Sequence, residues 1–327
     1  PSLNCSARCR YSRRSGPGAG IAGGRSVLAQ GLAIMAASKK TVRQSRTAPS
    51  RTIAFQGQPG AYSHLACRDY FPDMTPMPTA AFEDTFAAVT SGKAKLAMIP
   101  IENSVAGRVA DIHRIMPDSG LYITGERFLR VNHHLLAPKG ATLKSIRRVH
   151  SHVHALGQCG QFLRRHGLEA VVHVDTAGAA ADIAASGDPT EAAIASELAG
   201  EVYGLRSIRA NIEDAEHNTT RFVVMSRKPV RVKHGAGPVV TSFVFQVRNV
   251  PAALYKAMGG FATNGINMTK LESYMVDGDF VATQFYADVE GDPRDVSLKL
   301  ALEELDFFTH KVTILGTYPA DPFRFRT

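Results

Sequence analysis

Apolar and polar positions alternate along the chain after residue 50 with a period that changes from segment to segment. Short apolar runs such as 52–55 predict strands, and apolar residues at helical spacing, as in 81–89, predict helices. Further strands are predicted at 95–101, 121–124, 171–174, 192–195 and 223–225, and further helices at 155–165 and 177–186. Strands and helices that follow one another in this way predict an α/β fold.

A different pattern begins after residues 227–238, whose Pro, Gly and basic residues predict a linker. Beyond the linker, the predicted order is strand, helix, two strands, helix and strand, at 241–247, 252–258, 266–273, 280–287, 295–305 and 311–318. The turn between the two middle strands is predicted at Asp277-Gly278. This βαββαβ order is typical of a ferredoxin-like domain.

The strand at 223–225 decides how the α/β part is divided. If it rejoins the first sheet, the chain crosses between two lobes near residues 129 and 212, and two crossings form a hinge. The cleft between hinged lobes is a natural place to enclose a small polar ligand. We therefore predict a two-lobed domain at 51–228, with one lobe at about 51–129 and 212–228 and the other at about 130–211, and a ferredoxin-like domain at 239–320.

The charge of the chain is concentrated in its first 50 residues. The formal net charge is +9, and residues 1–50 contain nine Lys or Arg and no Asp or Glu, which leaves 29 basic and 29 acidic residues beyond them. The remainder is neutral and gives no electrostatic case for binding nucleic acid. No apolar run approaches the ~20 residues that cross a bilayer, so no membrane span is expected.

The first 50 residues are rich in Arg, Ser, Gly and Ala, and they lack a helical or strand period. We expect a disordered basic extension. Two alternatives stay open: an organelle transit peptide, which is also rich in Arg and poor in acids, and an upstream extension of a shorter frame that begins near Met35. A secretion signal is not expected, because the stretch has no long apolar core.

The four cysteines bear on compartment and on zinc binding. Cys5 and Cys9 have no second pair of ligands nearby, so no zinc site is expected there. Cys67 and Cys159 are the two cysteines of the remaining chain, and so few in a chain of this length suggest buried thiols. A reducing compartment such as the cytoplasm is therefore expected.

Three histidines alternate in the sequence at His150, His152 and His154. On a strand they would share one face, where imidazoles could bind a metal ion. No carboxylate or cysteine stands at a matching ligand spacing, so we expect no metal. The alternative that we favour is that one histidine caps a helix or lines a cleft while the others are solvated.

Candidate chemistry gathers at Asn218–Phe222, directly before the predicted strand at 223–225. An amide, two hydroxyls and a guanidinium side by side can hold a carboxylate and pass a proton to a leaving oxygen. The alternative is a capped turn before a strand. No Walker loop, HExxH or GxSxG motif occurs in the sequence.

A second polar group, Glu102-Asn103-Ser104, follows the apolar run 95–101. Ligands of open α/β sheets collect at the carboxyl ends of strands, so this trio is well placed to contact one. Asn103 or Ser104 could instead cap a helix by bonding its free amides, and the two interpretations are compatible.

Six stretches of the chain follow one another in an order that resembles a known family. Five are Gly57-x-x-Gly60-Ala61-Tyr62-Ser63, Pro100-Ile101-Glu102-Asn103-Ser104-x-x-Gly107, Ser151-His152 with Ala155-Leu156-x-Gln158-Cys159, Thr176-Ala177, and Asn218-x-Thr220-Arg221-Phe222. The sixth is the C-terminal domain, which resembles an ACT module. In this order the stretches resemble those of prephenate dehydratases, which make phenylpyruvate for phenylalanine synthesis. The resemblance implies a two-lobed, periplasmic-binding-protein-like catalytic domain followed by an ACT domain. The chain departs from the family pattern at His64, Val153 and His154.

The resemblance also implies roles for the motif residues. Thr220 would donate a proton to the departing hydroxyl or orient it, Arg221 would pair with a substrate carboxylate or brace the site, and Phe222 would form the wall that faces the ring. The implied catalytic residues are completed by Glu102, Asn103 and Ser104, and the implied substrate-binding positions are Ser63, Ser151, Gln158 and Thr176.

In the ACT-like domain, the resemblance implies an effector site for L-phenylalanine and pairing of these domains in a homodimer or homotetramer. Tyr274 and Met275 replace the Arg-Pro of one family motif. The implied effector-binding residues are Asn249, Pro251, Ala252, Ala253, Leu254, Glu272 and Ser273.

The implied reaction converts prephenate to phenylpyruvate with loss of carbon dioxide and water. No metal or organic cofactor is expected, because formation of the aromatic ring drives the reaction. Two alternatives remain: an arogenate dehydratase, which acts on the transaminated substrate, and a non-catalytic binding protein that senses amino acids.

Overall fold

The computed structural model describes residues 51–235, 237–248, 250–275 and 282–325. Several predictions fall outside these residues: the basic extension with Cys5, Cys9 and Met35, the effector residue Asn249, and the turn at Asp277-Gly278. Among the described residues, no helix is both long enough and apolar enough to cross a membrane.

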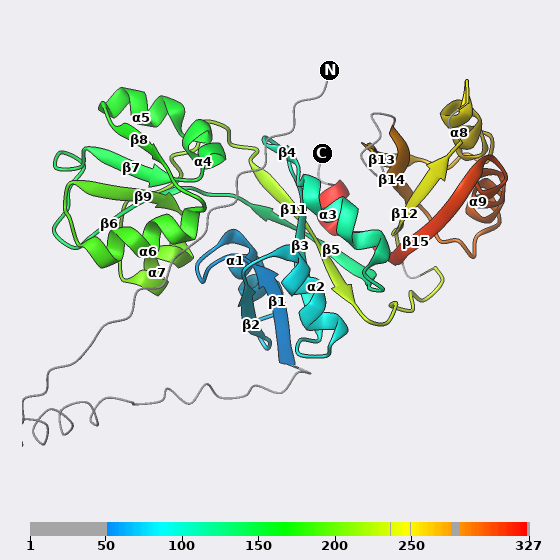
Figure 1. Cartoon of the computed structure of the whole chain (residues 1–327), viewed down its shortest axis with the longest axis horizontal. Helices are drawn as coiled ribbons and strands as arrows, with labels where there is room; N and C mark the ends of the chain where they lie inside the picture. The colour runs from blue at the N-terminus through cyan, green and yellow to red at the C-terminus, as the bar shows by residue number, and fades with distance from the viewer. Residues whose placement is uncertain (1–50, 236, 249, 276–281, 326–327) are drawn as a thin grey trace, which may run out of the picture. The chain divides into compact units, whose positions relative to one another are not determined.

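The first sheet is built from both ends of the α/β part. Its strands are β1 (Thr52–Gln56), β2 (Thr75–Thr79), β3 (Leu96–Asn103), β4 (Gly107–Arg108), β5 (Tyr122–Arg130) and β11 (Thr219–Ser226). The order is β2-β1-β3-β11-β5, with β4 paired to β3 (Figure 1). β1 is parallel to both its neighbours, whereas β11 is antiparallel to β3 and β5. The late strand β11 thus lies in the middle of the early sheet.

Apolar side chains cover both faces of this sheet. On one face, Phe55 and Phe222 pack with Cys67 of α1 (Tyr62–Tyr70). On the other face, Ile99 and Val223 pack with residues of α2 (Phe82–Thr90) and α3 (Ala110–Ile115). A short 3-10 helix, Met116–Asp118, follows α3. Strands covered on both faces read as continuous apolar runs, which is why the sequence shows them clearly.

The second sheet is formed by the segment between β5 and β11. Its strands are β6 (His134–Ala137), β7 (Arg148–Ser151), β8 (Glu169–Val172), β9 (Glu191–Ala195) and β10 (Arg206–Arg209), in the order β10-β6-β9-β7-β8. Leu135 packs toward α4 (Val153–Gln158) and α5 (Gly160–His166), whereas Leu136 packs toward α6 (Thr176–Ser186) and α7 (Glu197–Tyr203). The single helix predicted at 155–165 is therefore two helices, which meet at Cys159.

The third sheet has the predicted ferredoxin-like arrangement. Its elements are β12 (Val239–Val247), α8 (Ala253–Thr263), β13 (Met268–Met275), β14 (Ala282–Glu290), α9 (Val296–Phe308) and β15 (Thr309–Pro319), followed by a 3-10 helix at Pro322–Phe325. The strands are antiparallel in the order β13-β14-β12-β15, and α8 and α9 pack on one face through Phe261 and Leu298 (Figure 1). The predicted fold class is confirmed.

The histidine series does not lie on one strand as its alternation suggested. His150 is in β7, but the strand ends at Ser151, and His152 caps α4 by accepting a hydrogen bond from the amide of His154. The expectation that one histidine caps a helix is confirmed. Within the described ranges, no group of three or more His, Cys, Asp or Glu side chains is arranged to hold a metal ion.

The free face of the third sheet packs against the first sheet. Val240, Val244 and Tyr286 share one buried cluster with Ile99 and Val223. At Gly316 the approach is so close that an added Cβ would lie 2.1 Å from the carbonyl oxygen of Ile123. The C-terminal domain and the first lobe therefore share a core.

His113 of α3 is buried in this contact. Its ring stacks on Tyr274 and meets the edge of Tyr286, and neither ring nitrogen has a hydrogen-bond partner among the described residues. Burial lowers the pKa of His113 from its usual 6.5 to about 4, although the nearby Glu272 carboxylate opposes the shift. Folding therefore keeps this imidazole neutral.

We predict that His113 makes the protein less stable in acid. Between pH 6.5 and 4 the unfolded chain binds a proton that the folded chain does not, so stability is complete above pH 6.5 and falls as the pH decreases. At pH 4.5 the loss should be about 2–3 kcal/mol. Urea unfolding of wild type and His113→Leu at pH 7.5 and 4.5 measures it, and equal pH dependence in both proteins would contradict the prediction.

Candidate active site

Thr220 and Asn103 face each other across two central strands of the first sheet. They are cross-strand neighbours of β11 and β3, and the Asn103 Nδ2 atom donates to Thr220 Oγ1 at 2.9 Å. Beyond them the register shifts so that Arg221 pairs with Glu102 and Phe222 with Pro100, which leaves Ile101 as a bulge. A bulge is one of the few places where a central strand accommodates proline.

The carboxamide of Asn103 is fixed by four hydrogen bonds. Its oxygen accepts from the amides of Val105 and Ala106 at 3.0 and 2.8 Å. Its nitrogen donates to Asn218 Oδ1 at 2.8 Å as well as to Thr220. Asn103 thus bonds free backbone amides as predicted, but the segment that it caps is the turn from β3 to β4 and not a helix.

The direction of these bonds determines what the Thr220 hydroxyl can do. Because Asn103 Nδ2 is a donor, Thr220 Oγ1 is the acceptor, and the hydroxyl hydrogen remains free to point elsewhere. The side chain is only half-buried, and its hydroxyl has no acceptor within the described part of the chain. Thr220 is therefore arranged as a hydrogen-bond donor to a ligand.

The polar chain continues from β11 into the second lobe. Asn218 Nδ2 donates to Gln158 Oε1 at 3.0 Å, and the same oxygen lies 2.8 Å from His133 Nε2. The other ring nitrogen of His133 is 2.7 Å from the hydroxyl of Tyr62, in the first lobe. Burial lowers the pKa of His133 despite the bond to Gln158, so its imidazole is neutral at pH 7. The neutral ring links both lobes beside the motif residues.

A cleft of about 330 Å³ opens at this chain of side chains. Such a volume lies at the lower end of the usual range for small-molecule sites, which begins at roughly 300 Å³. The cleft is lined by residues of both lobes, namely Val105, Ala106, Val153, His154, Gly157, Gln158, Glu213, Asp214, Ala215 and Asn218. The predicted site residues Asn103, Ser104, Gln158 and Thr220 are brought together at or beside this cleft.

Ser104 supports the site through its hydroxyl. Its Oγ donates to the carbonyl of His217 at 2.7 Å and accepts from the amide of Thr219 at 2.9 Å. Both bonds join the β3–β4 turn to the residues that precede Thr220. With its hydroxyl used in this way, Ser104 fixes the backbone of the motif.

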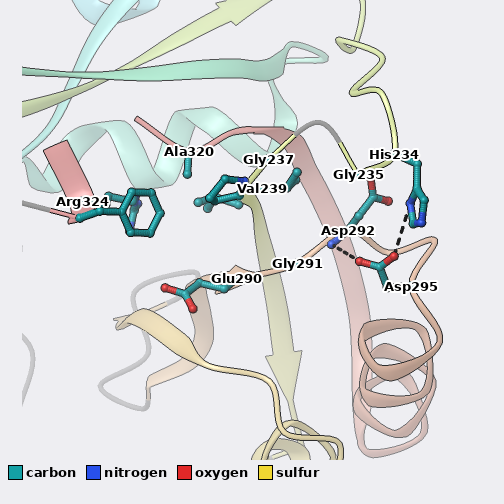
Figure 2. A pocket seen from close by; sticks show the side chains of 13 residues that line it. His234, Gly235, Gly237, Val239, Glu290, Gly291, Asp292, Asp295, Ala320 and Arg324 are labelled. Carbon is teal, nitrogen blue, oxygen red and sulfur yellow. Dashed lines mark hydrogen bonds and ion pairs between the residues drawn. The ribbon is translucent and has the colours of Figure 1, made fainter. Parts of the chain in front are cut away.

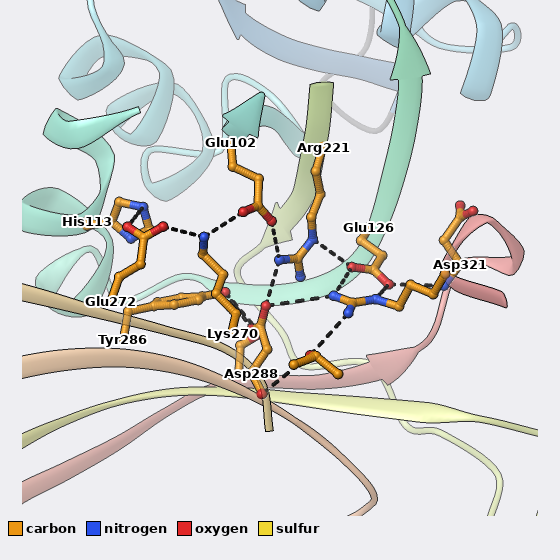
Figure 3. A network of polar contacts seen from close by, with 12 residues as sticks. Glu102, His113, Glu126, Arg221, Lys270, Glu272, Tyr286, Asp288 and Asp321 are labelled. Carbon is orange, nitrogen blue, oxygen red and sulfur yellow. Dashed lines mark hydrogen bonds and ion pairs between the residues drawn. The ribbon is translucent and has the colours of Figure 1, made fainter. Parts of the chain in front are cut away.

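Arg221 and Glu102 face away from the cleft. Successive residues of a strand point to opposite faces, so the neighbours of Thr220 and Asn103 point toward the C-terminal domain. Arg221 is 3% exposed on its side chain and pairs with Glu102, Glu126 and Asp288 (Figure 3). Of the two roles that the sequence implies for Arg221, pairing with a substrate carboxylate and bracing the site, this geometry fits only the second.

Phe222 and Ser151 are also turned into the protein interior. Phe222 is 1% exposed and packs in the core of the first lobe, so it faces helix α1 and not a ligand ring. Ser151, at the end of β7, is fully buried and donates to the carbonyl of Ile194 at 2.6 Å. Both residues support the elements around the cleft.

Ser63 and Thr176 mark the beginnings of two helices. Ser63 is the second residue of α1, and Thr176 is the first residue of α6, whose cap Asp175 accepts from the amide of Gly178. Amides at helix N-termini favour anions. No hydrogen bond within the described residues joins either side chain to Thr220 or Asn103.

The predicted effector residues lie in the C-terminal domain. Pro251 and Ala252 directly precede α8, and Ala253 and Leu254 are its first two residues; Ala252, the N-cap, has a left-handed φ of 62°. Glu272, on β13, turns toward the first lobe and lies 4.0 Å from Arg108 Nη1, which also donates to the carbonyl of Ser273. One of the two effector motifs therefore contacts the first lobe directly.

A second cavity, of about 600 Å³, has a different set of lining residues (Figure 2). It is bounded by the linker around His234, by Glu290 and Asp295 of the C-terminal domain, and by Arg324. His234 and Asp295 approach each other at 3.5 Å on its rim. It contains none of the predicted catalytic side chains, so the smaller cleft is the candidate active site.

Several residues of the site were not singled out from the sequence. Asn218 and Tyr62 were part of motif stretches, but no role was predicted for His133, which contacts both Tyr62 and Gln158. Glu126, Lys270 and Asp288, which surround Arg221 and Glu102, carry no motif at all. One available signal was the alternation of strand residues, which separates Thr220 from Arg221 and Asn103 from Glu102.

Fold and site together define the class. Two α/β lobes are joined by two chain crossings, and hydroxyl and amide side chains meet at the cleft, as in proteins that enclose a small polar molecule. Residues 53–230 match the prephenate dehydratase family. The chain belongs to this family and is thus an enzyme of the lyase class.

Comparison with individual proteins supports this membership. A bifunctional N-acyl-homoserine lactone acylase/prephenate dehydratase from Komagataeibacter europaeus is 52% identical over 274 residues, which cover 84% of this chain and 98% of the relative. Arogenate dehydratase/prephenate dehydratase 1 of Arabidopsis thaliana is 37% identical, covering 83% and 73%. The Arthrobacter aurescens prephenate dehydratase, solved in complex with L-Phe, has a TM-score of 0.75 at 29% identity, covering 82% and 89%.

Proposed function

We propose that this protein converts prephenate to phenylpyruvate, with loss of carbon dioxide and water, in the cleft beside Thr220. The single observation that carries the proposal is the bond from Asn103 Nδ2 to Thr220 Oγ1, which leaves the threonine hydrogen free for a ligand. Family membership supports the reaction type. An absorbance assay for phenylpyruvate with purified protein and prephenate tests the proposal.

The reaction requires a hydrogen-bond donor at the departing oxygen. The bond between the ring and its carboxylate breaks, the electron pair enters the ring, and the opposite carbon–oxygen bond breaks to release hydroxide. Thr220 hydrogen-bonds this oxygen or gives it a proton, which makes water the leaving group. Where the proton is transferred, Asn103 stabilises the charge that develops on Thr220 Oγ1 until solvent water returns a proton to this oxygen.

The substrate is a dianion, and no arginine lines the described cleft. We infer that its carboxylates meet amide donors, because Gln158 lies in the cleft wall and Ser63 and Thr176 mark helix N-termini. Glu213 and Asp214 also line the cleft. The Glu213 carboxylate accepts a hydrogen bond from the backbone amide of His133, and the Asp214 carboxylate accepts one from the backbone amide of Gln161. Negative charge in the wall favours release of the carboxylate as neutral carbon dioxide.

We further propose that L-phenylalanine binds the C-terminal domain and lowers activity. The predicted effector residues flank the start of α8 and lie on β13, and the similar protein of Arthrobacter aurescens was solved in complex with L-Phe. In that reading, paired C-terminal domains of a homodimer or homotetramer hold the effector.

The expected result is inhibition of phenylpyruvate formation by L-phenylalanine, with saturable binding by calorimetry. D-phenylalanine serves as the matched control, because it has the same charge and apolar surface with the opposite stereochemistry. Unchanged activity together with no heat of binding would remove the regulatory proposal and leave the catalytic one standing.

Substrate preference is the finer question within this family. A relative from Arabidopsis thaliana carries both substrate names, arogenate and prephenate. We favour prephenate, because the matching family model and the name of the 52% identical relative from Komagataeibacter europaeus both refer to prephenate dehydratase. Parallel kcat/KM measurements with the two substrates decide it, and a higher value for arogenate would reverse the preference.

A second candidate activity comes from the Komagataeibacter europaeus relative, whose name includes N-acyl-homoserine lactone acylase. Identity of 52% across nearly the whole relative favours testing it here. Chromatographic detection of homoserine lactone released from an N-acyl-homoserine lactone is the test. If Thr220→Ala abolishes both activities, they share the cleft; if the acylase activity persists, it has its own site.

The cellular compartment of the protein is proposed from the state of its Cys67 and Cys159 thiols. Cys67 and Cys159 are both free and buried. Burial raises the pKa of each thiol, which keeps it protonated and unreactive. We therefore place the protein in a reducing compartment such as the cytoplasm.

A further inference from the structure

Charged side chains from two domains meet behind the candidate active site (Figure 3). The first lobe contributes Arg221 from β11, Glu102 from β3 and Glu126 from β5. The C-terminal domain contributes the remaining members, namely Lys270, Glu272, Asp288 and Arg324. The motif residues that face away from the cleft are thus held from the other side by the C-terminal domain.

Asp288 is the closest charged partner of Arg221. Arg221 Nη1 lies 2.6 Å from Asp288 Oδ2 and 3.0 Å from Glu102 Oε1, and Nε lies 2.8 Å from Glu126 Oε2. The side chains of Asp288 and Glu126 are fully buried. Buried charges of this kind are stable only while they remain paired. The position of Arg221 therefore depends on a residue of another domain.

Asp288 itself is held in place within the C-terminal domain. Its Oδ1 accepts from Tyr286 at 2.7 Å and from Ser242, whose hydroxyl also meets Tyr318 at 2.7 Å. Tyr318 in turn accepts from Arg221 Nη2 at 3.2 Å. These hydrogen bonds hold the Asp288 carboxylate in one position, and Asp288 in turn holds Arg221.

Lys270 plays the corresponding part for Glu102. Its ammonium nitrogen lies 2.6 Å from Glu102 Oε2 and also bonds Glu272 Oε1, and its side chain is only 9% exposed. Glu272 belongs to a predicted effector motif, whereas Glu102 belongs to the cleft motif. A single ammonium group is thus shared between the two motifs.

The pair that these residues hold is adjacent to the reacting pair. Arg221 and Glu102 are cross-strand partners, and the next partners in the register are Thr220 and Asn103. The bulge at Ile101 interrupts the ladder on the other side of Arg221, so the regular sheet restrains this end of the strands less. Thr220 directly precedes Arg221 in the chain, and Asn103 directly follows Glu102. A displacement of Arg221 or Glu102 therefore also displaces Thr220 or Asn103.

We propose that Lys270 and Asp288 of the C-terminal domain are positioning residues for the reaction in the cleft. They fix the Glu102–Arg221 pair, and through it they hold Asn103 and Thr220 in register with the departing oxygen. Displacements of about 1 Å are enough to cost large factors in rate. The proposal rests on the proposed dehydratase function. Because Lys270 contacts both Glu272 and Glu102, a ligand that binds near Glu272 would change the position of Glu102 through Lys270.

Lys270→Met tests this with little change in side-chain length. We expect kcat for phenylpyruvate formation to fall about tenfold while KM changes less than twofold, because positioning affects the transition state more than binding. Lys270→Arg should restore at least half of kcat. Lys299→Met removes an exposed lysine paired with Glu303 in the same domain and should behave like wild type.

Asp288→Asn is the second variant, with Asp292→Asn as its matched control, because Asp292 is a buried aspartate of the same domain that bonds Arg294 instead of Arg221. A kcat within twofold of wild type in folded Lys270→Met and Asp288→Asn would overturn the proposal. Should Asp288→Asn not fold, the result with Lys270→Met alone decides.

Hydrogen–deuterium exchange separates this inference from the proposed function. Faster exchange of β11 and β3 amides in Lys270→Met than in Lys299→Met supports the positioning role even if the wild type does not act on prephenate. Unchanged exchange in those strands would overturn the inference, whatever the activity. Failure of the wild type on prephenate would instead count against the dehydratase assignment.

Discussion

Replacing Thr220 with alanine is expected to lower kcat about 100-fold or more, the usual scale for loss of a positioned proton donor. The physical reason is the hydrogen bond that Asn103 Nδ2 donates to Thr220 Oγ1. Because Oγ1 is the acceptor in this bond, its own hydrogen is free to be donated to a ligand. Alanine removes the acceptor of that bond and the hydroxyl hydrogen that would be donated to the ligand. Thr220→Ser keeps the hydroxyl and should retain most of the activity.

The measurement is initial-rate kinetics of phenylpyruvate formation, with thermal unfolding as a check of the fold. Thr124→Ala is a suitable control, because Thr124 lies in the same sheet and donates its hydroxyl to the carbonyl of Val224 at 3.1 Å, away from the cleft. Turnover like that of the wild type in Thr220→Ala would remove this residue from the mechanism. The response to phenylalanine should persist in the residual activity.

The largest effect on stability is expected from Arg221→Met. Burial disfavours the charge on Arg221, but Asp288 and the other neighbours outweigh this and raise its pKa well above the usual value. Burial likewise opposes the charge on Asp288, and Arg221 with the bonds from Ser242 and Tyr286 lowers the pKa of the carboxyl below its ordinary value. Removing the guanidinium leaves buried carboxylates with too few partners, at a cost of about 3–5 kcal/mol.

Urea unfolding at pH 7.5 measures that cost. Arg68→Met is the matched control: its guanidinium also pairs with a glutamate, Glu201, but about half of each side chain is exposed. Ion pairs of that kind contribute at most about 1 kcal/mol. A loss of stability below about 1 kcal/mol in Arg221→Met would mean that the buried cluster does not depend on this arginine.

The fold class was predictable because the sequence shows which segments are covered on both faces. Uninterrupted apolar runs at 52–55, 95–101 and 223–225 belong to one sheet, and the last of them returns to it after the second lobe. The order of elements after residue 238 is likewise the βαββαβ order that the structure has. The local spacing of apolar residues predicts these elements and their order, and no knowledge of contacts between them is needed.

Side-chain direction was harder to predict from the motifs. The Thr-Arg-Phe stretch was treated as one functional unit, whereas a strand divides it: Thr220 stands beside the cleft, Arg221 points to the C-terminal domain, and Phe222 fills a core. Its partner motif is divided in the same way, with Asn103 on one side and Glu102 on the other. A period of two separates Thr220 from Arg221 and Asn103 from Glu102, but it does not distinguish Thr220 from Phe222.

The contacts between domains could not have been predicted from one sequence. Lys270 lies 168 positions from Glu102 along the chain, and Asp288 lies 67 from Arg221. No local pattern links such pairs, because they depend on how the third sheet packs on the first. The same holds for His133, whose contacts with Tyr62 and Gln158 join segments of both lobes.

The most direct test of the account is a crystal structure of Thr220→Val soaked with prephenate. This variant keeps the shape of the side chain and removes its hydroxyl, so the substrate should persist. We predict that the hydroxyl group on its ring lies against residue 220, with Asn218 and Gln158 in the surrounding wall. Substrate bound in the cavity beside His234, or bound between the lobes without contact to residue 220, would contradict the account.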